Sequence, residues 1–127
     1  MRFVASLQWL LVATIGSACM QRADDPAREH LASALSDSLG RNAEPSVGFL
    51  KNSKHLQLSL SAARFAEYSD SAFARQAKEI AGFALRRYEN ASGLDSITVL
   101  DRELVSQGVW KIHRMHTFGV DELRRVR

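Results

Sequence analysis

The sequence predicts a small α+β domain that follows an N-terminal leader. Residues 55–61 alternate between apolar and polar side chains, which predicts a half-buried strand, and residues 71–89 have the apolar periodicity of a long helix. A shorter helix and three further strands complete the pattern, at 26–39, 46–50, 96–104 and 109–118. We expect a four-stranded, mainly antiparallel sheet with the one long helix packed on one face.

Composition is consistent with this domain. The 127 residues are 46% apolar and 24% charged, which is ordinary for a globular protein. The net charge of +3 is modest, and we expect no nucleic-acid partner because the basic residues are not clustered strongly. One cysteine cannot form an internal disulfide.

The helix predicted over residues 26–39 starts at a clear signal. Asp24 and Asp25 suit the positive end of the helix dipole, and Pro26 is well tolerated in a first turn. Gly40 provides a stop. An apolar stripe with a spacing of four lies between them, formed by Leu31, Leu35 and Leu39.

A β-hairpin is predicted over residues 46–61, with its turn at 51–54. Leu56, Leu58 and Leu60 share one face of the second strand. The opposite face is polar, with His55, Gln57, Ser59 and Ser61. Residues 62–69 remain ambiguous between a loop and one helical turn.

The long helix is predicted from a cap at Ser69 or Asp70 to a C-cap at Asn90. Its small alanines allow a close approach to a sheet. The apolar face consists of Phe73, Ala77, Ile80, Ala81, Ala84 and Tyr88.

The second hairpin turns at residues 106–108. Trp110, Ile112 and Phe118 have one parity, so we expect them in the core. Arg114 and His116 interrupt that face, which predicts a bulge or partial exposure there. Residues 120–127 are expected to form a short helical or frayed basic tail.

The second face of the sheet is predicted to be less apolar. The N-terminal helix covers part of it, or the face meets a protein partner; periodicity alone leaves both open. Its residues are His55, Gln57, Ser59, Thr98, Leu100, Arg102 and Leu104.

The leader has the three parts of a secretory signal. Arg2 supplies a positive charge, residues 3–15 are mostly apolar, and residues 16–18 are small. A membrane-spanning helix needs about 20 apolar residues, and this run is shorter and contains Gln8. We therefore expect cleavage of a signal peptide rather than a spanning helix.

The only cysteine, Cys19, directly follows the leader. Residues 10–19, ending in Gly16-Ser17-Ala18-Cys19, resemble the lipobox of bacterial lipoprotein precursors, although leucine is usual at the position of Gly16. The resemblance implies that Cys19 becomes the lipidated first residue and anchors the protein to the membrane. By the same family rule, Met20 favours the outer membrane, if the organism has one. The alternatives are ordinary cleavage, which gives a periplasmic or secreted protein with a free thiol, and an uncleaved anchor or folded helix.

No catalytic, metal or cofactor site is predicted. His113 and His116 would lie on opposite faces of a strand, and adding His55 still gives a poor metal site. Ser59, His113 and Asp101 could be combined into a catalytic triad, but in a serine-rich chain such a combination is weak evidence for catalysis. Asp101 and Glu103 are interpreted as solvated carboxylates beside Arg102.

We therefore divide the chain into a signal peptide at 1–18, a tether at 19–25 and one domain at 26–127. The leading hypothesis is a non-enzymatic binding or scaffolding domain of the bacterial cell envelope, anchored through Cys19. One alternative is a hydrolase that uses His113 with a nearby carboxylate. Another is a binder of anionic surfaces that uses basic residues, namely Arg75, Lys78, Arg86, Arg87, Arg124, Arg125 and Arg127.

Overall fold

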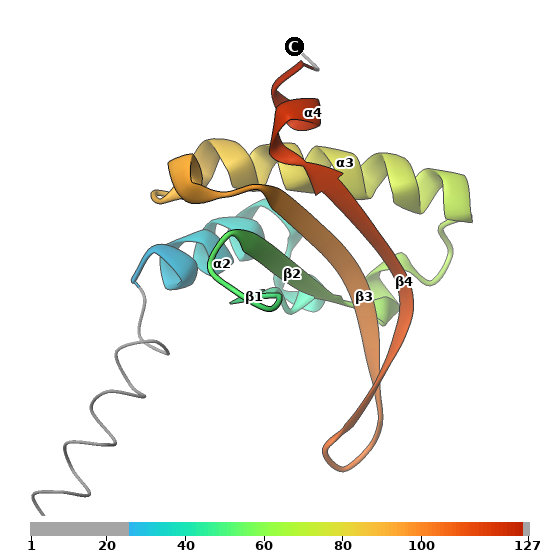
Figure 1. The fold of residues 1–127 in the computed structure, drawn as a ribbon. Helices are drawn as coiled ribbons and strands as arrows, with labels where there is room; N and C mark the ends of the chain where they lie inside the picture. Colours follow the sequence, from blue (N-terminus) through green and yellow to red (C-terminus); the bar gives the residue numbers. More distant parts are fainter. Residues whose placement is uncertain (1–25, 126–127) are drawn as a thin grey trace, which may run out of the picture.

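The structure, a computed structural model, describes residues 26–125 and has the α+β architecture that the sequence predicts (Figure 1). The predicted signal peptide at 1–18, the tether at 19–25 with Cys19, and residues 126–127 lie outside this range. The helices are α2 (Pro26–Leu39), α3 (Asp70–Arg87) and α4 (Val120–Arg125). The strands are β1 (Ser46–Phe49), β2 (His55–Ser61), β3 (Ser96–Ser106) and β4 (Val109–Gly119). Short 3-10 helices are η1 (Arg41–Ala43), η2 (Ala62–Phe65) and η3 (Ala91–Gly93).

The first helix and the first hairpin are confirmed where the sequence places them. Leu31 and Leu35 of α2 are each only 1% exposed, so the predicted stripe is the buried face. Strands β1 and β2 pair antiparallel, with Val47 opposite Leu58. The turn between them includes Lys51 with a positive φ of 70°.

Helix α3 begins at its predicted cap but ends earlier than expected. The Ser69 hydroxyl accepts a hydrogen bond from the backbone N–H of Ala72 at 3.1 Å. Tyr88 then adopts an extended conformation that ends the helix, while its N–H still donates to the carbonyl of Ala84. Tyr88 is buried and is the C-cap of the helix. The prediction of Asn90 as the C-cap is therefore wrong. The ambiguous segment before the helix contains η2.

The sheet is mixed, which corrects the expectation of a mainly antiparallel one. The strand order is β1-β2-β3-β4. The outer pairs are antiparallel, but the central pair, β2 with β3, is parallel. The reason is the connection: α3 carries the chain back along the sheet, so β3 starts at the same end as β2 and runs beside it. Each hairpin is antiparallel internally, but this does not determine whether the two hairpins pair with each other in a parallel or an antiparallel direction.

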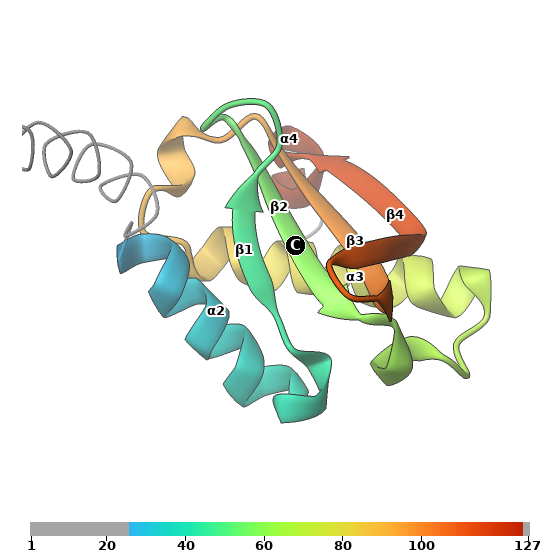
Figure 2. The same cartoon turned by 90° about the horizontal axis from the view of Figure 1, so that it is seen from below.

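All three helices contribute to one core on one face of the sheet. Leu31 and Leu35 of α2 join the same cluster as Ile80 of α3 and Leu123 of α4. The expectation of one long helix on that face was therefore incomplete. Figure 2 shows α3 crossing behind the sheet and α2 alongside β1. The sheet residues of this core are Leu56, Leu58, Leu60, Ile97, Val99 and Phe118.

The register of β3 and β4 contains the bulge that the sequence predicts near Arg114. Asp101 is opposite Arg114, whereas the next residue, Arg102, is opposite Ile112. Strand β4 therefore holds one extra residue, and its side chains change face at this point. Phe118 lies in the core as expected, but Trp110 and Ile112 lie on the other face with about half of their surface exposed. Their placement in the core was wrong.

Beyond the bulge the last two strands leave the body of the domain. The final pair between β2 and β3 is Ser61 with Arg102. Past it, residues 103–112 continue as a two-stranded projection, which we call the arm (Figure 1). The arm determines the position of the candidate site.

Candidate functional site

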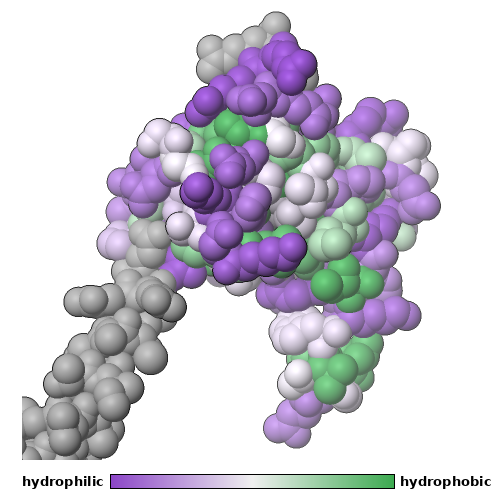
Figure 3. Space-filling view, in the orientation of Figure 1, coloured by the Kyte–Doolittle hydropathy of each residue, from purple (hydrophilic) through white to green (hydrophobic). Residues whose placement is uncertain are grey.

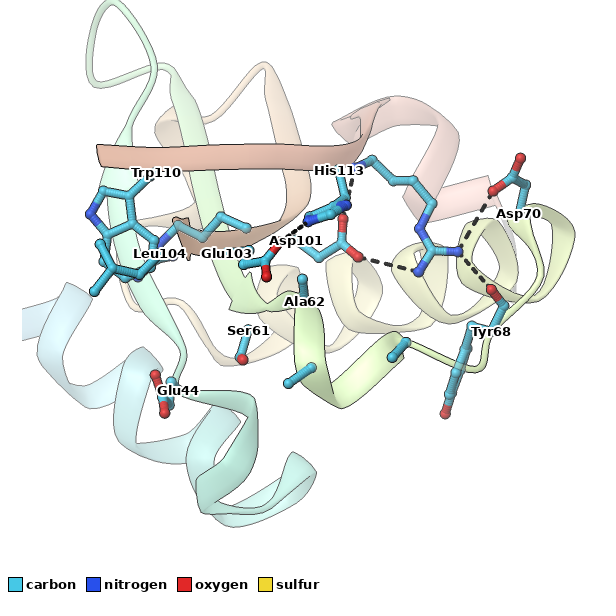
Figure 4. Close-up of a pocket in the computed structure, with 14 residues that line it drawn as sticks. Glu44, Ser61, Ala62, Tyr68, Asp70, Asp101, Glu103, Leu104, Trp110 and His113 are labelled. Atoms are coloured by element: carbon cyan, nitrogen blue, oxygen red, sulfur yellow. Dashed lines mark hydrogen bonds and ion pairs between the residues drawn. The ribbon is translucent and has the colours of Figure 1, made fainter. Parts of the chain in front are cut away.

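An open cleft of about 750 Å³ lies between the arm and the body. Figure 4 shows the arm on one side of it and η2 on the other. Ala62, Ala63 and Ala66 have small side chains, which leaves the cleft open on the η2 side. The charged and aromatic lining residues include Glu44, Asp70, Asp101, Arg102, Glu103, Trp110, His113 and Arg114.

Asp101 and Arg114 form the inner, structural part of this cleft. The backbone N–H of Arg114 donates to Asp101 Oδ1 at 2.7 Å, and Nη2 donates to Oδ2 at 3.2 Å. The same guanidinium donates to the carbonyls of Phe65 and Tyr68, each at 2.8 Å. Asp101 is fully buried, so its interpretation as a solvated carboxylate was wrong. This network ties the η2 segment to the sheet.

Glu103 and His113 form the outer, accessible pair. His113 Nε2 lies 2.8 Å from Glu103 Oε1, and the two side chains are 36% and 55% exposed. His113 is the extra residue of the bulge, without a partner in the β3–β4 register, and its side chain reaches Glu103 of β3. An imidazole with a carboxylate partner in a cleft can transfer protons, so this arrangement is compatible with acid–base chemistry.

Arg102 and Trp110 stack at the foot of the arm. The guanidinium carbon of Arg102 lies 4.5 Å from the centre of the Trp110 ring. Burial lowers the pKa of Arg102 below its ordinary value, and the negative charge of Glu44 partly offsets that effect. Nη1 of Arg102 is buried and has no hydrogen-bond partner among residues 26–125. Glu44 adopts a left-handed conformation, with φ 44°.

The arm exposes an unusual amount of apolar surface. Leu104 is opposite Trp110, Arg102 is opposite Ile112, and Leu100 is opposite Met115, so these side chains share one face. Leu104, Trp110, Ile112 and Met115 are 50–54% exposed, and we call these four the apolar row. Val105 and Val109, both 51% exposed, add further apolar surface nearer the turn. Figure 3 shows apolar side chains gathered on the projecting arm. The sequence reasoning missed this surface because it carried the parity of Phe118 through the bulge.

The less apolar sheet face predicted from the sequence is therefore divided. Near the body, Ser59, Thr98 and Leu100 are buried. The Thr98 and Thr117 hydroxyls share a hydrogen bond of 2.8 Å. Near the arm, the same face carries the apolar row. Helix α2 does not cover this face, because its buried leucines belong to the core on the opposite side.

Other candidate residues are not brought together. The Ser59 hydroxyl accepts from the Gln57 amide at 3.4 Å, so Ser59, His113 and Asp101 each have separate partners. His55 Nδ1 lies 2.8 Å from the Ser96 hydroxyl, and His116 lies against the Phe73 ring. Within residues 26–125 no group of three or more histidines, cysteines or acids could hold a metal ion.

The basic residues of α3 lie away from the arm. A shallow second groove of about 590 Å³ is lined by Arg75, Lys78 and Arg86 together with Phe83. Arg87 stacks on Phe83 at 5.1 Å. These cations are therefore spread along the outer surface of one helix.

Among the helices of the described part, none is long and apolar enough to cross a membrane. A search against family models, curated proteins and solved structures finds no significant match to this chain.

Proposed function

We propose that this protein is a small bacterial envelope lipoprotein whose domain binds another protein through the arm and has no enzymatic role. The observation that carries the proposal is the apolar row, four large side chains that are each about half exposed, three of them on the arm and the fourth, Met115, just beyond its foot. Contiguous exposed apolar surface on a soluble domain is typical of interaction sites. Aromatic residues such as Trp110 are enriched at the centres of such interfaces.

The anchoring part of the proposal rests on the lipobox-like residues 10–19. A diacylated or triacylated Cys19 would hold the protein firmly, because each buried CH₂ group contributes about 0.8 kcal/mol. Residues 19–25 of the tether span at most about 25 Å when fully extended. The domain would therefore stay close to the bilayer, with the outer membrane favoured.

Anchoring is tested by mass spectrometry of the mature N-terminus and by fractionation. We expect acyl chains on Cys19 in the native protein, and release of the Cys19→Ser variant from the membrane fraction. An unmodified Cys19 on a membrane-free protein would instead indicate ordinary secretion.

Binding through the arm is tested by photo-cross-linking in living cells. A photoreactive residue placed at Ile112 should give a discrete protein adduct, whereas the same residue at the exposed Arg87 on α3 should not. Trp110→Ser should remove the adduct without changing the amount of protein. Equal labelling from both positions, or none from Ile112, would contradict the proposal.

A hydrolase is the second candidate, and the Glu103–His113 pair in the cleft supports it. Here His113 would act as a general base, with Glu103 orienting its ring. The test is turnover of a panel of ester and amide substrates by the purified protein. Activity that is lost in His113→Gln and reduced in Glu103→Gln would favour this candidate over a binding domain.

A further inference from the structure

The net positive charge of the domain is concentrated on two neighbouring helices. Helices α3 and α4 together hold six cations and four acids, a net charge of +2. The rest of residues 26–125 holds eight cations and eight acids, so it has no net charge when its histidines are neutral. The two helices are in contact, because Ile80 of α3 and Leu123 of α4 belong to one core cluster. We call their outer surface the basic side, and its cations are Arg75, Lys78, Arg86, Arg87, Arg124 and Arg125.

Three of these cations line the groove of about 590 Å³ along α3, together with a single acid among the described lining residues, Glu79. Arg75 and Arg86 are exposed, and no ion pair holds either of them within residues 26–125. Lys78 has a loose partner, since its Nζ lies 3.8 Å from Glu122 Oε2, and its side chain is 40% exposed. The positive charge of the groove is therefore available to an external anion.

Apolar side chains lie among these cations. Leu39 of α2, Phe83 of α3 and Leu123 of α4 line the same groove. Phe83 is only partly buried, and the guanidinium carbon of Arg87 lies 5.1 Å from the centre of its ring. Cations around an aromatic and apolar centre match the surface of an anionic bilayer. There, phosphates accept hydrogen bonds from guanidinium groups, and apolar side chains reach toward the lipid chains beneath.

The basic side lies opposite the arm. Figure 1 shows α3 and α4 at the top of the domain, whereas the arm projects from the other end. A domain that rests on a membrane through α3 and α4 therefore directs Trp110 and the rest of the arm away from the lipid. Contact with the membrane and binding of a protein by the arm are thus compatible.

We propose that the basic side rests on an anionic phospholipid surface, with lipid phosphates bound by Arg75 and Arg86 and with Phe83 at the level of the headgroups. The inference goes beyond the proposed function, because it assigns a second ligand to the domain and orients the arm relative to the membrane. The contact does not require the anchor at Cys19. An anchor would strengthen it by keeping the headgroups at a high local concentration.

The probe is a single tryptophan in the full protein, mixed with vesicles that contain a phosphatidylcholine brominated near the headgroup. Every variant carries Trp9→Phe, so one form reports from Trp110 alone. The other form adds Trp110→Phe and Phe83→Trp, and it reports from the groove. In vesicles that also contain phosphatidylglycerol, we expect the tryptophan at position 83 to be quenched and Trp110 to be unaffected. Neither should be quenched when phosphatidylglycerol is absent.

The decisive variant combines Arg75→Gln with Arg86→Gln. Each cation near an anionic surface strengthens binding about fivefold, so loss of both should weaken the contact about thirtyfold and remove the quenching at position 83. The matched control removes two exposed cations from the turn between β1 and β2, through Lys51→Gln with Lys54→Gln, and should keep the quenching. Salt at about 1 M should remove it as well, because the screening length falls to about 3 Å. Thermal melting checks that both variants stay folded.

Flotation of the same vesicles separates this inference from the proposed anchoring. Protein that floats with both kinds of vesicle, but without quenching at position 83, is anchored and does not use the basic side, which overturns the inference. Protein that floats only with phosphatidylglycerol, with quenching at position 83, supports the inference in the absence of an anchor.

Three other outcomes would also overturn the inference. These are no flotation with either kind of vesicle, quenching at position 83 that does not depend on phosphatidylglycerol, and quenching that persists in the variant without Arg75 and Arg86. A discrete protein adduct from a photoreactive residue at Arg87, without quenching at position 83, would assign the basic side to a protein partner instead.

Discussion

Two carboxylates separated by one residue on β3 have opposite environments. Asp101 lies beneath the bulge, fully buried, where Arg114 donates to both of its oxygens. Glu103 lies in the arm, and its side chain and that of its partner His113 are both well exposed. The difference follows from position along the strand, because Asp101 still has β2 as a neighbour and Glu103 does not.

This difference predicts unequal effects on stability. Asp101→Ala leaves the guanidinium of Arg114 without its buried counter-charge, and we expect the free energy of unfolding to fall by about 3–5 kcal/mol. Glu103→Ala, the matched control, should lower it by less than about 1 kcal/mol, because exposed ion pairs contribute little. Urea denaturation at neutral pH measures both. Similar losses in the two variants would mean that Asp101 does not hold the η2 segment to the sheet.

At the scale of the element, α3 contains a glycine that its structure does not require. Gly82 lies in the middle of the helix with ordinary helical geometry, and a Cβ there would meet only the flexible end of Arg86, at 3.4 Å. Gly108, by contrast, has a φ of 76° in the turn of the arm. Only the second position needs the conformational freedom of glycine.

Substitution of each glycine by alanine should therefore have opposite effects. Gly82→Ala is expected to raise the free energy of unfolding by about 0.5–1 kcal/mol, because it removes the backbone entropy cost of a helical glycine. Gly108→Ala should lower it by about 1 kcal/mol, because alanine is strained in the left-handed region. Thermal unfolding of the two variants is the measurement. A destabilised Gly82→Ala would indicate that Arg86 cannot move aside.

The elements themselves were predictable because they depend on local signals. The alternation of residues 55–61, the stripe of α2 and the Ser69 cap each depend on neighbours in the sequence, and each is confirmed. The parallel pairing of β2 with β3 was not predictable, since it depends on where α3 returns the chain. The candidate site was missed for a related reason: one extra residue in β4 reverses the faces of Trp110 and Ile112. The interruption of the apolar pattern at Arg114 indicated a bulge, but it did not indicate that the side chains on the other side of the bulge change face.

At the scale of the whole molecule, apolar side chains serve two different roles. Phe73 is completely buried between the helices and the sheet, whereas Trp110 is half exposed on the arm. We expect Phe73→Ala to lower the free energy of unfolding by about 3–5 kcal/mol. Trp110→Ser, although it removes a larger side chain, should lower it by no more than about 1 kcal/mol. Chemical denaturation compares the two, and a large loss for Trp110→Ser would place the arm within the folding core rather than on a binding surface.

The same difference between a buried core and a half-exposed arm predicts that the arm opens independently of the body. Its two strands lack a third neighbour, and its apolar side chains are only half covered, so its amides should exchange with solvent through local openings. The amide of Val99 lies between two strands and should exchange only through global unfolding. Ile80→Val lowers global stability by about 1 kcal/mol. It should therefore speed exchange of the Val99 amide about fivefold and leave the amides of Leu104 and Trp110 unchanged. Faster exchange at all three positions would mean that the arm and the core unfold as one unit, with no independent motion available for capturing a partner.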